Sequence, residues 1–265
     1  MDVLARSPDT ALQDADTVAA GLFEGEQAPA GAPDAVVQLV ASGEARAKLG
    51  SIALAHADGR RWLLVGMGAR ADLTPERARV AAAKALHRAR DAGANTLCWL
   101  LPDGAGGEVA GALVEGTVLA DYRFEEFKSA PPPDERPPLE RLVIACPDEL
   151  QNDVGDAAVI AVWVNRARDL QNRPGNDLTP GALGDYTRAL AEELPGLSVE
   201  VEGRERIAAR GMGAFSAVAQ GSAQEPALIT MRYEPASAAG SPELAFVGKA
   251  VTFDSGGISL KPGAK

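Results

Sequence analysis

The chain has 265 residues, of which 46% are hydrophobic and 24% are charged, enough apolar material for one large or two ordinary domains. Its formal net charge of -11 repels phosphate backbones and argues against nonspecific binding to nucleic acid. Residues 1–12 lack a basic segment followed by an apolar one, so we expect no signal peptide. The longest apolar run, residues 157–164, is too short to span a bilayer. Together these properties predict a cytoplasmic protein.

The first clear pattern is strand, helix, strand. Residues 61–65 and 96–101 are apolar runs typical of buried strands. Between them, Thr74 can cap a helix that begins at Pro75 and continues to Asp91, and Gly93 can end it. Elements of these lengths predict a right-handed parallel crossover in one sheet.

A proline-rich stretch at residues 128–138 is expected to form an exposed loop. Residues 139–146 then return as a strand, and residues 153–171 predict one long helix that is apolar around much of its surface. We therefore divide the chain into an N-terminal α/β domain at residues 1–150, a connecting helix at 151–172, and the beginning of a second domain at 173–265.

The second segment repeats the alternation. Thr179 can cap a helix that runs from Pro180 to Leu194, and another short helix is expected at residues 204–210. Predicted strands are residues 197–201, 227–233 and 244–247. The predicted fold class is α/β: two α/β domains with largely parallel sheets, joined by a long helix, with the second domain incomplete.

The stretch with the most chemistry follows the last predicted strand. Residues 248–262 read GKAVTFDSGGISLKP, so Lys249, Asp254 and Lys261 leave the sheet where α/β proteins bind ligands. The glycine pair 256–257 permits turns that could fold Lys261 back towards Asp254. From this pattern alone, an exposed turn with solvated charges remains the alternative interpretation.

This stretch resembles the signature of the leucyl aminopeptidase, or cytosol aminopeptidase, family. Two further stretches are similar to family blocks in order and spacing: residues 167–180, ARDLQNRPGNDLTP, and residues 211–222, GMGAFSAVAQGS. The resemblance covers residues 150–265 most clearly. It implies that the N-terminal domain is similar to the macro fold, which binds ADP-ribose.

The resemblance also implies a chemistry and an assembly. Two divalent metal ions, Mn or Zn, would lie side by side, with Lys249 bound to one of them and Asp254 bridging both. Lys261 would approach the substrate as the catalytic residue without binding metal. The substrates would be peptides that lose N-terminal amino acids one at a time, with a leucine-type preference, and the protein would be a homohexamer.

Family members carry further metal-binding carboxylates and an arginine beyond the matched loop. None of these can lie within residues 1–265, so we expect the 265-residue chain on its own to be inactive. A rival hypothesis is a non-catalytic binding or assembly module with an α/β pocket for a nucleotide-like ligand.

Weaker signals complete the pattern. Residues 66–71, GMGARA, fit a dinucleotide fingerprint after a strand, although the helix begins too late, and a tight turn is the alternative. His56 and His87 are expected at the surface or in packing. Cys98 and Cys146 lie in apolar runs and are expected to be buried, reduced thiols.

Overall fold

The computed structural model describes residues 1–13, 15–129, 137–234 and 244–251. Contacts divide the chain into two compact units, Met1–Asp169 and Leu170–Lys265, and each is described by itself. Across the described residues, no helix combines the length and the apolar character that crossing a bilayer requires.

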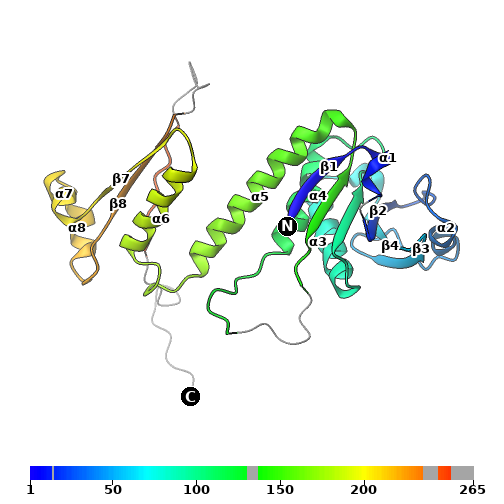
Figure 1. The fold of residues 1–265 in the computed structure, drawn as a ribbon, viewed down its shortest axis with the longest axis horizontal. Helices are drawn as coiled ribbons and strands as arrows, with labels where there is room; N and C mark the ends of the chain where they lie inside the picture. The colour runs from blue at the N-terminus through cyan, green and yellow to red at the C-terminus, as the bar shows by residue number, and fades with distance from the viewer. Residues whose placement is uncertain (14, 130–136, 235–243, 252–265) are drawn as a thin grey trace. The chain divides into compact units, whose positions relative to one another are not determined.

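The first unit is built on a six-stranded sheet (Figure 1) with the order β1-β6-β5-β2-β4-β3. All neighbouring strands pair in parallel except β3, which is antiparallel to β4. The strands are β1 Asp2–Arg6, β2 Thr17–Phe23, β3 Ile52–Ala57, β4 Arg60–Gly68, β5 Thr96–Leu100 and β6 Arg141–Ala145. β4 and β5 are therefore parallel, as predicted, with β2 between them.

Helices cover both faces of this sheet. Buried side chains of α3, α4 and α5 pack on one face, and those of α1 and α2 pack on the other. These helices are α1 Pro8–Ala11, α2 Asp34–Ala41, α3 Pro75–Asp91, α4 Gly107–Ala120 and α5 Gln151–Asn172, with short 3-10 helices at Arg70–Asp72 and Asp148–Leu150. The sheet is the middle of three layers.

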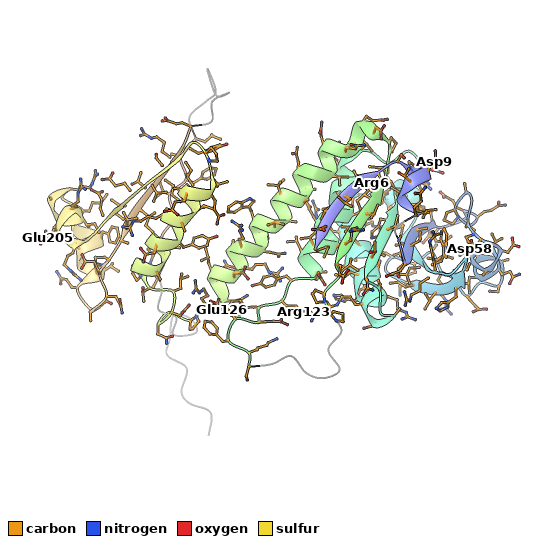
Figure 2. The ribbon with its side chains drawn as sticks, in the orientation of Figure 1. Arg6, Asp9, Asp58, Arg123, Glu126 and Glu205 are labelled. Carbon is orange, nitrogen blue, oxygen red and sulfur yellow. The ribbon has the colours of Figure 1, made fainter. Side chains whose placement is uncertain are left out.

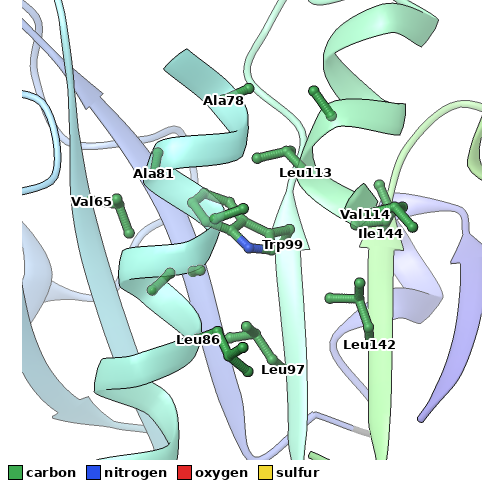
Figure 3. Close-up of a cluster of buried hydrophobic side chains, with 14 of the residues drawn as sticks. Val65, Ala78, Ala81, Leu86, Leu97, Trp99, Leu113, Val114, Leu142 and Ile144 are labelled. Atoms are coloured by element: carbon green, nitrogen blue, oxygen red, sulfur yellow. The ribbon is translucent and has the colours of Figure 1, made fainter. Parts of the chain in front are cut away.

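The strand sequences explain this sandwich. Successive strand residues point to opposite faces, and both faces are covered here, so neighbouring residues are buried in different cores. Leu97 and Trp99 join the core beneath α3 and α4, whereas Cys98 joins the core on the other face. Figure 3 shows Trp99 between Ala81 of α3 and Leu113 of α4. Near-continuous apolar strands are typical of such doubly covered sheets.

The two ends of helix α3 form as the sequence predicted. Thr74 precedes α3, and its hydroxyl accepts a hydrogen bond from the Arg77 amide at 3.3 Å. Gly93 follows the helix with a φ of 77°, the left-handed conformation that glycine adopts without strain.

The second unit contains helices packed around a two-stranded sheet. In chain order these elements are α6 Pro180–Glu193, β7 Leu197–Glu202, α7 Arg204–Ala209, α8 Gly213–Ala219 and β8 Leu228–Tyr233. Thr179 caps α6 as expected, accepting from the Ala182 amide at 3.2 Å. The α/β fold class is confirmed. One detail differs, because β7 and β8 pair antiparallel where a parallel arrangement was expected.

The strand predicted at residues 244–247 is not formed: in the described part of the chain, these residues have no regular secondary structure. Their side chains are highly exposed: 79% for Leu244, 94% for Phe246 and 99% for Val247. A strand needs backbone partners, and neither sheet of the described chain includes this segment. An apolar sequence alone was therefore a misleading signal.

Candidate metal-binding loop and its surroundings

Only one of the three expected site residues lies in the described chain. Lys249 is exposed and belongs to the irregular segment at residues 244–251. Asp254 and Lys261 fall outside the described residues, so their expected roles stay predictions. Among the residues that are described, no group of three or more His, Cys, Asp or Glu side chains could hold a metal ion. The fit to a metal therefore rests on donor chemistry: an amine nitrogen and a carboxylate oxygen both suit Zn or Mn.

The first family-like block, residues 167–180, forms the end of α5 and the start of α6. Between these helices Arg173 donates from Nε to Asp177 Oδ2 at 2.6 Å. The amides of Asp177 and Leu178 both donate to the Pro174 carbonyl at 2.9 Å. This block therefore makes a hydrogen-bonded turn that delivers the chain to the Thr179 cap.

The second block, residues 211–222, contains α8 and begins at Gly211, whose φ is 73°. Just before it, the Glu202 carboxylate at the end of β7 is 2% exposed and pairs with two arginines. Arg206 Nε lies 3.0 Å from one oxygen, and Arg210 Nε lies 2.7 Å from the other. These contacts hold α7, and the turn into α8, against β7.

A polar cluster lies at the carboxyl end of the large parallel sheet, where α/β proteins bind ligands. Arg70, after β4, stacks on the ring of Phe23, the last residue of β2, at 3.9 Å. It donates to Oε2 of Glu26, in the loop after β2, at 2.7 Å. It also donates to the Asp103 carbonyl, after β5, at 3.1 Å. The hydrogen bond from Arg70 lowers the pKa of Glu26. One guanidinium thus ties three loops together.

Sequence reasoning missed this cluster, because Arg70 and Glu26 are separated by 44 positions, and the GMGARA pattern that contains Arg70 does not point to Glu26 as its partner. The two glycines of the GMGARA pattern have a structural explanation. A side chain at Gly66 would collide with the carbonyl oxygens of Lys48 and Arg46. Gly68 has a φ of 80°, where glycine is favoured. Close packing and a turn therefore account for both glycines.

The remaining candidates match their expected settings. His56 lies on β3 and His87 on α3, and both are exposed. Figure 2 marks Asp58 at the turn between β3 and β4, two positions after His56 in the sequence. Cys98 and Cys146 are buried and free. Burial raises the pKa of Cys98 to about 12 and also raises that of Cys146, so neither thiol is prepared for nucleophilic chemistry.

Comparison with known families identifies the family of this chain. Residues 13–131 match the model described as "Cytosol aminopeptidase family, N-terminal domain". Residues 165–265 match "Cytosol aminopeptidase family, catalytic domain". The chain belongs to the cytosol aminopeptidase family. Both blocks and residues 248–262 fall in the catalytic-domain match, as the sequence resemblance predicted.

Curated members of the cytosol aminopeptidase family are similar along nearly the whole chain. A probable cytosol aminopeptidase from Roseiflexus castenholzii is 35% identical over 269 residues, which cover 99% of this chain and 55% of that protein. A probable cytosol aminopeptidase from Solibacter usitatus is 37% identical, covering 94% of this chain and 52% of the relative. The chain thus spans about half the length of these relatives.

Solved structures support the fold. The bottromycin maturation enzyme BotP, in a complex with Mn, is 30% identical with a TM-score of 0.70, covering 83% of this chain and 46% of BotP. A mutant of tomato leucine aminopeptidase has a TM-score of 0.74 at 21% identity, covering 89% of this chain and 51% of the tomato chain. The second likeness is evidence of fold alone.

Proposed function

We propose that this protein is a metal-dependent aminopeptidase that removes amino acids from the N-termini of peptides, with a leucine-type preference. The observation that carries this proposal is the ordered match of both domains of one peptidase family along a single chain. The catalytic-domain match includes the positions of Lys249, Asp254 and Lys261. The Mn complex of BotP supports a divalent metal as cofactor.

Two of these residues are proposed as metal ligands. Asp254 has two carboxylate oxygens and is suited to bridge two ions, either Mn or Zn. Lys249 can bind a single ion only as the neutral amine. Divalent ions held there would polarise the peptide carbonyl and activate a water molecule. The substrate's free amino group would bind beside them, which accounts for cleavage one residue at a time.

Lys261 is proposed as the catalytic residue. It lies seven positions after Asp254, across the glycine pair 256–257, so the loop could bring its ammonium close to the scissile carbonyl. A positive charge there stabilises the oxygen that becomes negative in the transition state. Loss of such a donor acts on turnover more than on substrate binding.

The organisation of the whole protein belongs to the same proposal. We retain an N-terminal domain at residues 1–150, a connecting helix at 151–172 and the start of the catalytic domain at 173–265. A homohexamer in the cytoplasm follows from the family resemblance. That the 265-residue chain is inactive by itself also stays a prediction.

An assay of the complete gene product tests the activity. Purified protein loaded with Mn or Zn should hydrolyse leucine p-nitroanilide, and removal of metal with a chelator should abolish the reaction. An N-acetylated leucine anilide is the control, because its blocked amino group should prevent cleavage. Equal rates on the two substrates, or no hydrolysis with any divalent metal, would refute the proposed reaction.

Metal counting on variants of the same protein tests the residue roles. Asp254→Ala should lose both ions, whereas Lys249→Ala should chiefly weaken one. Lys261→Ala should keep both ions and a similar KM while kcat falls by about 10²–10³. Lys84→Ala, at an exposed position of α3, is the matched control. Two tightly bound ions in Asp254→Ala, or normal turnover in Lys261→Ala, would contradict the assignment.

A further inference from the structure

Helices α4 and α5 lie side by side and run in the same direction, so that the α5 residues that contact α4 each meet a residue a similar number of positions earlier in the chain. Gly107 at the start of α4 meets Asp153, and Gly111 one turn later meets Ala157. Near the end of α4, the Asn165 side chain donates a hydrogen bond to the Val118 carbonyl, and the Arg168 side chain donates one to the Leu119 carbonyl. α5 residues between Asp153 and Arg168 therefore contact both the first and the last turn of α4.

Contacts at the start of α4 are close and complementary in charge. The Asp153 carboxylate occupies the space that a side chain at Gly107 would need. An added Cβ at Gly111 would lie 3.2 Å from the Ala157 Cβ. The missing side chains of these two glycines let the helix backbones approach, and the Asp153 charge lies at the positive end of the α4 dipole.

Contacts at the end of α4 satisfy backbone groups that the helix leaves without partners. The last four carbonyls of a helix lack amide donors from the same helix. Asn165 donates from Nδ2 to the Val118 carbonyl at 3.2 Å, and Arg168 donates from Nη1 to the Leu119 carbonyl at 2.9 Å. The positive charge of Arg168 also lies at the negative end of the α4 dipole, where cations are stabilising.

Arg168 is itself held in place by two groups. Its guanidinium stacks on the ring of Tyr122 at 3.9 Å, and Nη1 donates to Asn165 Oδ1 at 3.0 Å. Tyr122 lies just after the α4 C-cap at Asp121, in the loop where Figure 2 marks Arg123 and Glu126. A planar cation that stacks and donates at once is a role that lysine does not reproduce.

We propose that Asn165 and Arg168 form a cap in trans on α4 that fixes the second half of α5, making α5 a rigid part of the N-terminal unit as far as this cap. The contact boundary between Asp169 and Leu170 falls one residue after Arg168. Arg168 is thus a positioning residue within the first family-like block. This inference is independent of the proposed reaction, because no catalytic residue takes part in it.

Distances within the first unit test the cap. Spin labels at His87→Cys on α3 and Ala167→Cys on α5 use two exposed positions, and the native thiols Cys98 and Cys146 are buried and resist labelling. In the 265-residue chain, pulsed electron paramagnetic resonance should give one narrow distance distribution. Arg168→Ala should broaden it, even though alanine is the stronger helix former.

Hydrogen exchange provides the second measurement. Loss of a hydrogen bond to a charged donor should raise exchange at residues 160–169 by about tenfold, while α3 and β5 keep their protection. Asn165→Ala should give a smaller increase, and Arg168→Lys should restore protection only in part. Arg188→Ala, which removes an exposed arginine from α6, is the control and should change neither measurement.

Three results would overturn the proposal. The first is a distance distribution in Arg168→Ala as narrow as in the parent chain. The second is full rescue by Arg168→Lys, because charge alone would then suffice. The third is a broad distribution in the parent chain itself. If Arg168→Ala fails to fold, Asn165→Ala and Arg168→Lys still decide, since each removes only part of the cap.

Discussion

Strands and helices alternate both in residues 1–169 and in the described residues after 169. The two regions differ in how completely their apolar side chains are buried. In the first region both faces of the sheet are covered, and side chains such as Trp99 and Leu113 are fully buried. In the second, Ile207 is buried, but Phe246 and Val247 are almost fully exposed. Among the described residues, packing is thus concentrated in the first region, whereas Lys249, the one site candidate that the structure describes, is exposed.

The largest expected effect compares one aromatic side chain from each region. Trp99→Ala should destabilise the first unit by about 3–5 kcal/mol, because it empties a fully buried site between the sheet and two helices. Phe246→Ala should change stability by less than about 0.5 kcal/mol, because that side chain is 94% exposed. Urea unfolding followed by circular dichroism measures both. Similar losses would remove the contrast between the regions.

A smaller loss of stability is expected from the substitution of Gly66, where the backbone of the first region packs closely. Gly66→Ala places a methyl group against the backbone carbonyls of Lys48 and Arg46, which cannot rotate away as a side chain can. We expect a loss of about 1–3 kcal/mol.

The matched control for that change is Gly155→Ala. Gly155 is an exposed α5 position with no atom within 4 Å of the added group. Since alanine favours helix over glycine, the control should be more stable by about 0.5–1 kcal/mol. The thermal unfolding temperatures of the two variants should therefore shift in opposite directions, and a gain in both would show that the close backbone approach at Gly66 is unimportant.

Local signals predicted the elements that begin or end at a recognisable residue. Thr74 and Gly93 bound α3 where the sequence suggested, and Thr179 caps α6. These contacts are made within a few residues, so a single sequence contains both partners. The alternation of strand and helix likewise sufficed for the α/β fold class.

Elements made of small residues escaped prediction. Strand β2, with the sequence TVAAGLF, lies inside the sheet but resembles a loop in composition. Helix α4 is buried against α3 and α5, so it shows no polar face, and Gly107, Gly111 and Gly116 look like helix breakers. Their true role is close helix contact, which depends on residues far along the chain. The same limit hid the Arg70 cluster and made residues 244–247 look like a strand.

The smallest effect comes from a titrating group in the well-packed region. The Asp121 side chain at the end of α4 is 7% exposed, and Arg90 Nη1 lies 3.4 Å from its Oδ1. Burial raises the pKa of Asp121 from 3.8 to about 6, although the Leu139 amide, the N-terminal ammonium and His87 act in the opposite direction. The folded state therefore binds this proton more tightly than the unfolded state does.

The sign of the pH effect follows from that difference. Stabilisation from the raised pKa is complete below the unfolded value of 3.8 and is lost as the pH rises through about 6. Between pH 5 and pH 7 the first unit should lose about 1 kcal/mol from this group. Asp121→Asn should remove that slope in urea unfolding, whereas Asp9→Asn, at an exposed position of α1, should keep it. An unchanged slope in Asp121→Asn would assign the pH dependence to another group.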